Sequence, residues 1–127
     1  MTATARMTGP YRLLRPGDDL AIVRARLTNW ARWARDASEH GYQLSSLWPQ
    51  DLGTYSADEL DAALVERVLC ALKGSDRLWR RRLWWALEER YLRSRDVLSA
   101  ASAQRIPVAV YEQRLRSGER MVERMLR

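Results

Sequence analysis

The sequence predicts an all-α protein, a helical bundle of three helices followed by a C-terminal helix-turn-helix module of two. Apolar residues recur every three or four positions, and no stretch alternates with the period of two that is typical of a strand. Glycine or proline stands where helices should end or begin. A chain of 127 residues can hold one domain, or two small modules that share a core. We expect a flexible arm over residues 1–17, a helical body over 18–93 and the helix-turn-helix module over 94–127.

The first helix should begin behind a capping Asp18 and continue to about Glu39. Its apolar residues form one seam, at Leu20, Val23, Leu27, Trp30 and Ala34. Trp30 therefore belongs to the expected core. Trp33 either widens the seam or stands exposed beside arginines, where it could bind a partner or stack on a base.

The second and third helices follow a loop over residues 42–55 that we expect to pack on the body. Ser56 and Glu59 have the spacing of a capping box, and Gly74 should end the second helix. Cys70 stands between two leucines and is expected in the core as an inert thiol. Ser75 or Asp76 should cap the third helix, which continues to about residue 93. Its expected core positions are Leu78, Leu83, Leu87 and Tyr91, with Trp79 and Trp84 beside them.

The C-terminal segment has the pattern of a helix-turn-helix. Asp96 can cap a short helix of small residues, a break follows at residues 104–106, and Pro107 suits the first position of the next helix. Two registers are open, with Ala100 packing against Val110 or Ala101 against Tyr111. No glycine stands in the turn, so residue 104 or 105 must take its place.

The net charge is +6, from 22 basic and 16 acidic residues, and the only lysine is Lys73. Arginine binds phosphate bidentately and stacks on bases, so this excess favours a nucleic-acid partner. A GC-rich genome would also replace lysine by arginine.

Several kinds of site are not supported. One cysteine and one histidine, His40, cannot form a Cys/His zinc site, and no glycine-rich phosphate loop or catalytic constellation is present. We therefore expect no enzyme activity, no metal and no cofactor. The carboxylates, Glu66, Glu119 and Glu123 among them, are expected on solvated helix faces near arginines. No signal peptide or membrane span is apparent, which predicts a cytoplasmic protein.

The last helix has two interpretations, as one more amphipathic helix of the bundle or as a recognition helix in the major groove of DNA. In the second case its first turns face base edges with Val108, Ala109, Glu112 and Gln113. Phosphates or guanines would then be bound by Arg105, Arg114 and Arg116. The run Arg80–Arg82 is either a solvated face or a phosphate contact. Because three consecutive residues cannot share a helix face, at least one of these arginines should lie near the core edge.

Three segments together resemble the phage late-gene antitermination Q proteins of the phage 21 type. Leu27–Trp33 (LTNWARW) is similar to the family's doubly Trp-marked helix, with Ala31 in place of a glycine. Asp58–Val65 is similar to its second helix, and Tyr111–Val122 to its terminal helix. Pro107 departs from the serine usual in the family.

The resemblance implies a helix-turn-helix similar to sigma region 4 and a role in transcription. Such a protein binds double-stranded DNA near a late promoter and loads onto paused host RNA polymerase that holds sigma. It then narrows the RNA exit channel, so that terminator hairpins do not form. The arginine-rich faces with Arg32, Arg35, Arg80, Arg81 and Arg82 are candidates to contact nascent RNA. The rival predictions are a helix-turn-helix regulator without a role in elongation and a helical protein-interaction module.

Overall fold

The structure is a computed structural model that describes residues 20–39 and 56–127. Within these ranges the chain is all-α, as the sequence predicts. The elements are α1 (Ala21–Glu39), α2 (Ala57–Lys73), α3 (Leu78–Leu87), the π-helical turn η5 (Glu88–Leu92), α4 (Val97–Gln104) and α5 (Val108–Leu126). The predicted arm, the cap at Asp18, His40 and the loop over residues 42–55 lie outside the described residues.

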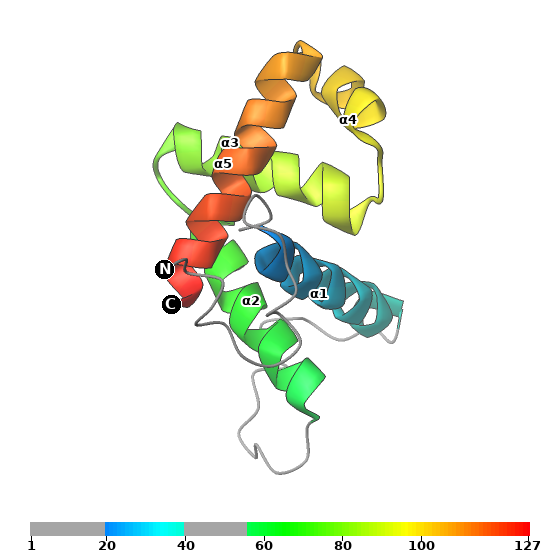
Figure 1. Ribbon diagram of the computed structural model, residues 1–127, viewed down its shortest axis with the longest axis vertical. Helices are drawn as coiled ribbons and strands as arrows, with labels where there is room; N and C mark the ends of the chain where they lie inside the picture. Colours follow the sequence, from blue (N-terminus) through cyan, green and yellow to red (C-terminus); the bar gives the residue numbers. More distant parts are fainter. Residues whose placement is uncertain (1–19, 40–55) are drawn as a thin grey trace, which may run out of the picture.

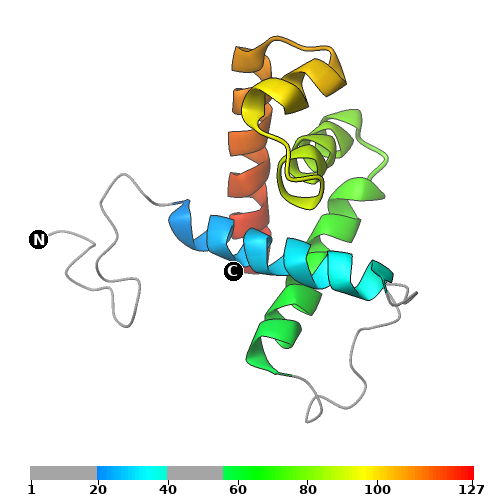
Figure 2. The same cartoon turned by 90° about the vertical axis from the view of Figure 1, so that its right-hand side faces the viewer.

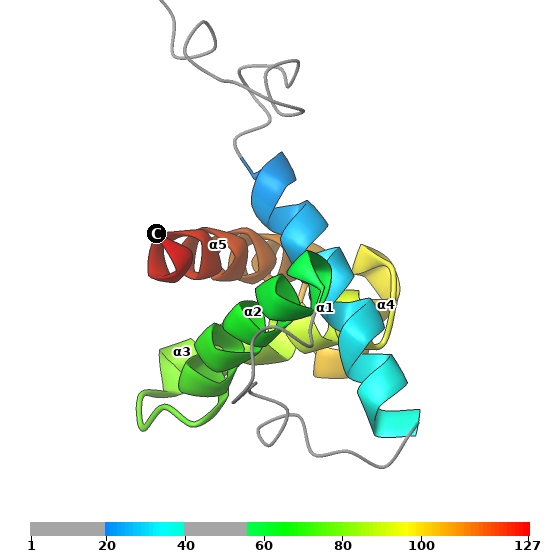
Figure 3. The same ribbon diagram turned by 90° about the horizontal axis from the view of Figure 1, so that it is seen from below.

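Helix α5, with 19 residues as long as α1, runs between two groups of helices. Short α4 packs at one end of α5, while α1 and α2 gather around the other (Figure 1). Figure 2 shows α1 lying across α2 and the C-terminal half of α5. Seen from below, α1 and α2 cross each other instead of running side by side (Figure 3). The core therefore forms where α1, α2, α3 and α5 meet.

This core confirms the apolar seam predicted for the first helix, because all five of its residues are buried. Leu27 and Trp30 have no exposed surface, and Trp30 packs edge-to-face on Trp84 with ring centroids 6.1 Å apart. Trp84 is thus a core residue of α3. Trp33 is half-buried and packs against the same cluster, so the structure favours the interpretation in which it widens the seam.

Helix α2 begins and ends as its local sequence predicts. The backbone N–H of Glu59 donates to Ser56 Oγ, and Glu59 Oε1 accepts from the Ser56 N–H, which completes the capping box. Gly74 is the C-cap residue. The predicted cap of α3 is wrong: Ser75 Oγ accepts from the N–H of Arg77, and Arg77 itself is the N-cap residue, without a side-chain cap. The Ser75 hydroxyl therefore stabilises the turn before α3 and does not cap the helix.

Two predicted core residues are exposed. Cys70 lies one position past the face of α2 that carries Leu69 and Leu72, so its thiol is exposed. Leu78 is 42% exposed, because α3 enters the core only from Leu83 onward. The first correction follows from the position of Cys70 around α2, and the second from where α3 meets its neighbours.

Glu119 is buried, contrary to the prediction of a solvated carboxylate. It is 2% exposed and accepts hydrogen bonds from Arg24 Nε and Nη2, each at 3.1 Å. The Tyr91 hydroxyl donates to the same carboxylate at 2.6 Å. Burial and the neighbouring carboxylate raise the pKa of Tyr91, so the phenol stays protonated. This cluster joins α1, η5 and α5.

Glu66 is likewise buried, at 8% exposure, against the predicted solvated position. Its carboxylate accepts from Trp30 Nε1 at 3.5 Å and from the Cys70 thiol at 3.8 Å. These are long contacts, and burial raises the pKa of Glu66 above its ordinary value. Near neutral pH, burial of the charged Glu66 carboxylate therefore destabilises the folded state.

We expect Glu66→Gln to stabilise the fold at pH 7 by about 0.5–2 kcal/mol. The amide keeps an acceptor for Trp30 and carries no charge to desolvate. A group whose pKa is raised by folding contributes stability that is fully present below its unfolded pKa and is lost as the pH rises through its folded pKa. Urea unfolding at pH 7 and pH 4 measures the effect. The gain should shrink at pH 4, and an equal gain at both values would contradict the assignment.

Candidate nucleic-acid interface

The turn between α4 and α5 is built by local hydrogen bonds. Asp96 caps α4 by accepting from the N–H of Ser99 at 2.7 Å, as predicted. At the other end Arg105 has φ 57° and ψ 43°, the left-handed conformation that usually selects glycine. The N–H of Ile106 donates to the carbonyl of Ala101 at 3.1 Å. This is a Schellman ending, and it turns the chain sharply into α5.

Helix α5 begins one residue later than predicted. Pro107, with φ −60° and ψ 148°, is the N-cap residue and Val108 the first helical residue. A proline at either position leaves no N–H unsatisfied, so the shift costs the helix no hydrogen bond.

Tyr111 anchors the start of α5 to the body. Its side chain is fully buried, and its hydroxyl donates to the carbonyl of Ala86 in α3 at 2.7 Å. Burial raises the pKa of Tyr111 to about 12, which keeps this donor protonated. Val110 is only half-buried, so Tyr111 is the large inward-facing residue, as in the second of the two registers. Ala100 and Ala101 are both buried, and their burial does not distinguish the registers.

The outer face of the first turns of α5 is exposed to solvent. Ala109, Glu112, Gln113 and Arg116 are exposed at helical spacing on the side opposite Tyr111 and Leu115. Arg105 is exposed at the turn. The remaining two residues predicted for DNA binding differ: Val108 is half-buried against the core, and Arg114 is half-buried on the flank of α5 that faces α3.

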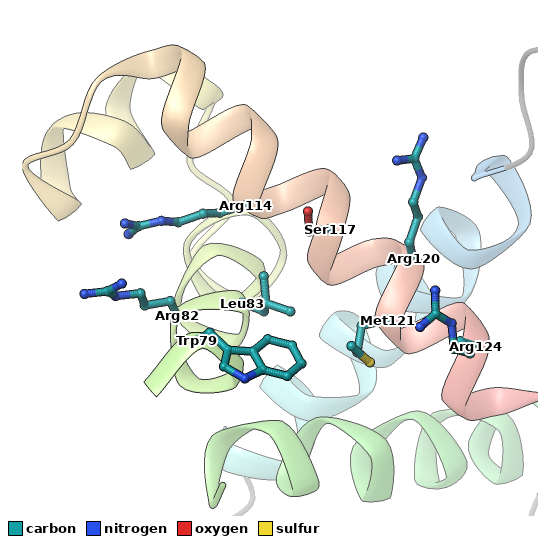
Figure 4. A pocket seen from close by; sticks show the side chains of 8 residues that line it. All are labelled: Trp79, Arg82, Leu83, Arg114, Ser117, Arg120, Met121 and Arg124. Carbon is teal, nitrogen blue, oxygen red and sulfur yellow. The ribbon is translucent and has the colours of Figure 1, made fainter. Parts of the chain in front are cut away.

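Both flanks of this outer face carry arginines. On one side a depression is lined by Arg24, Arg90 and Arg116 together with two carboxylates, those of Glu112 and Glu119. On the other side Arg114 of α5 and Arg82 of α3 extend in the same direction (Figure 4). Cationic groups on either side of an exposed helix face match the two phosphate backbones that border a DNA groove.

The other predicted contact residues have mixed surroundings. Arg32 is exposed on α1. Arg35 donates to the carbonyls of Tyr91 and Leu92 at 3.1 and 3.2 Å, which closes the end of η5. Its guanidinium is therefore engaged in holding the fold.

The three consecutive arginines of α3 point in different ways. Arg80 lies over the ring of Trp79, with its guanidinium carbon 5.3 Å from the ring centroid. Arg81 donates to the carbonyl of Ser75 at 2.8 Å. Both are half-buried, which confirms that the run cannot share one face, and only Arg82 is exposed.

Three residues that the sequence did not single out for a site also meet here. Trp79, Arg120 and Arg124 line the same depression as Arg82 and Arg114. Arg114, Ser117, Met121 and Arg124 recur at helical spacing, which is a weak signal for one flank of α5. These residues of α5 lie beside Trp79 of α3 only because the two helices cross at this point.

The crossing of α3 and α5 is close because Gly118 stands at the contact. A Cβ atom there would lie 3.2 Å from Leu87 Cγ and 3.4 Å from the Leu83 carbonyl oxygen. The absent side chain lets the backbones approach and brings the arginines of the two helices to one surface.

Within the two described ranges, no group of His, Cys, Asp and Glu side chains could hold a metal ion. Nor is any helix of these ranges long and apolar enough to cross a membrane. Comparisons with protein-family models, with curated proteins and with solved structures found no match for this chain.

Proposed function

We propose that this protein is a DNA-binding transcription factor that reads the major groove with the first turns of α5. The carrying observation is the exposed face of Ala109, Glu112, Gln113 and Arg116, presented behind the turn at Arg105. A helix of eight residues, a tight turn and a second helix with a free outer face match the docking of helix-turn-helix modules.

The side chains on this face can discriminate bases. Gln113 can form a bidentate pair with adenine, Arg116 with guanine, and Glu112 can accept from the amino group of cytosine. Ala109 is small enough to contact a thymine methyl group. Arg105 and the arginines on the two flanks support the proposal by supplying phosphate contacts.

The resemblance to phage late-gene antitermination proteins extends the proposal to a specific role. We propose that the protein binds DNA near a promoter, joins paused host RNA polymerase that holds sigma, and suppresses termination. DNA binding through α5 would then be the loading step. A simple regulator of initiation is the alternative.

We expect Gln113→Ala to weaken binding to the preferred duplex by about 1–3 kcal/mol and to relax the preference at one base pair. The preferred sequence comes from selection on a random duplex library, and affinity from anisotropy at fixed salt. Arg127→Ala is the control, because Arg127 is exposed at the far end of α5 and pairs only with Glu123 within the described residues. Unchanged affinity and preference for Gln113→Ala and Glu112→Ala together would refute recognition by this face.

Single-round transcription tests the role in elongation. With the selected site placed beside a promoter, the protein should increase readthrough of a downstream intrinsic terminator. Gln113→Ala should reduce readthrough in proportion to its loss of DNA affinity. Altered initiation without readthrough, on a template that the protein occupies, would identify the simple regulator instead.

A further inference from the structure

A basic depression of about 440 Å³ lies between α3 and α5, on the flank of α5 next to its proposed DNA-reading face. Helix α3 contributes Trp79, Arg82 and Leu83 to its lining, and α5 contributes Arg114, Ser117, Arg120, Met121 and Arg124 (Figure 4). We call it the α3–α5 groove. Four of its eight lining side chains are arginines and none is acidic.

The four arginines of the groove are unpaired within the part of the chain that the structure describes: no salt bridge or side-chain hydrogen bond engages them. Several arginines elsewhere are paired, for example Arg26 with Asp61 and Arg95 with Glu89. Like charges around one depression repel each other, and a bound polyanion would relieve this repulsion. The groove thus has the charge of a phosphate-binding surface.

Trp79 adds a second kind of contact. It is 46% exposed although it is large and apolar, and Arg80 lies over its ring without lining the groove. Leu83 and Met121 form apolar surface nearby (Figure 4). An exposed indole beside unpaired arginines is the combination with which proteins hold single strands, through stacked bases and neutralised phosphates. An acidic peptide would satisfy the arginines but gives Trp79 no role.

The near end of the groove, at Arg114, borders the proposed reading face, whereas its far end, at Arg124, lies beyond that face. Arg124 lies eleven residues beyond Gln113, or ~16 Å along the helix axis at about 1.5 Å per residue. The major groove is about 12 Å wide, so the far end of α5 would extend past a duplex read by its first turns. A flexible strand can follow the groove where a stiff duplex cannot.

We propose that the α3–α5 groove binds single-stranded nucleic acid, with a base stacked on Trp79 and phosphates on Arg82, Arg114, Arg120 and Arg124. This binding does not require α5 to read a duplex.

The test measures anisotropy of labelled 12-nucleotide RNA and DNA strands, and of a hairpin duplex, with the full chain. Trp79→Ala should weaken single-strand binding by about 10-fold or more, the loss of one stacked base, and leave duplex affinity within about 2-fold. Trp85→Ala is the matched control, because Trp85 is similarly exposed on α3 at 42% but does not line the groove. Arg124→Glu should weaken single-strand binding and flatten its salt dependence, whereas Arg127→Glu, with the same change in net charge, should do so far less.

The proposal would be overturned if Trp79→Ala and Trp85→Ala lost the same affinity for single strands, or if Trp79→Ala lost none. Displacement of the strand by polyglutamate, combined with unchanged binding by Trp79→Ala, would reassign the groove to acidic peptides. Duplex affinity is measured separately. A negative result for single strands therefore does not contradict duplex recognition by Gln113, and a negative result for the duplex does not contradict single-strand binding in the groove.

Discussion

Replacing Trp30 by alanine is expected to lower the free energy of unfolding by about 3–5 kcal/mol. The side chain is fully buried, contacts Trp84 edge-to-face and donates to the buried carboxylate of Glu66. Its removal leaves a large cavity where α1 packs on α2 and on Trp84, and it removes the nearest hydrogen-bond donor to Glu66. Urea unfolding followed by circular dichroism measures the change.

The matched controls are Trp79→Ala and Trp85→Ala. These side chains are 46% and 42% exposed, so their truncation should cost less than about 1 kcal/mol. Trp30→Phe should give an intermediate loss, because part of the aromatic volume remains. Similar losses for Trp30→Ala and Trp79→Ala would contradict the burial of Trp30 in the core where α1, α2, α3 and α5 meet.

Replacing Glu119 by alanine is expected to cost about 2–4 kcal/mol, the second-largest effect. The change leaves the Tyr91 hydroxyl without its acceptor and opens space between α1, η5 and α5. The loss stays below that of a fully buried ion pair, because the Arg24 side chain is 51% exposed and water can solvate it. Thermal and urea unfolding at pH 7 provide the measurement.

A double-mutant cycle separates the contributions at this cluster. Tyr91→Phe and Glu119→Ala share the 2.6 Å hydrogen bond, so their combined cost should fall short of the sum by at least about 0.5 kcal/mol. Pairing Glu119→Ala with Arg26→Ala, whose partner is Asp61, should give additive losses. Additivity in both cycles would mean that Glu119 does not bind Tyr91 in solution.

Local sequence signals predicted the helices well. The capping box at Ser56 and Glu59 and the cap at Asp96 each depend on contacts within one helical turn, and the structure contains them. The π-helical turn at Glu88–Leu92 was not anticipated. Its end is held by Arg35, more than fifty residues away in sequence, which no local pattern reveals.

The candidate interface was predicted only in part. The exposed face with Glu112, Gln113 and Arg116 follows from the period of one helix. The position of Arg114 beside Arg82, and of both beside Trp79, requires the crossing of α3 and α5. That crossing depends on Gly118, whose importance cannot be read from helix periodicity, because glycine is merely a weak helix former in isolation.

The sequence by itself determined the helical class, most helix ends and the apolar seam of α1, since these depend on residues within a few positions of one another. Only the tertiary structure decided which polar and aromatic side chains are buried. Glu119 and Glu66 enter the interior, while Trp79 stays outside it. The physical reason is that burial depends on which helix crosses a given face and at what point. Those crossings are set jointly by long-range contacts such as Tyr111 with Ala86 and Arg24 with Glu119.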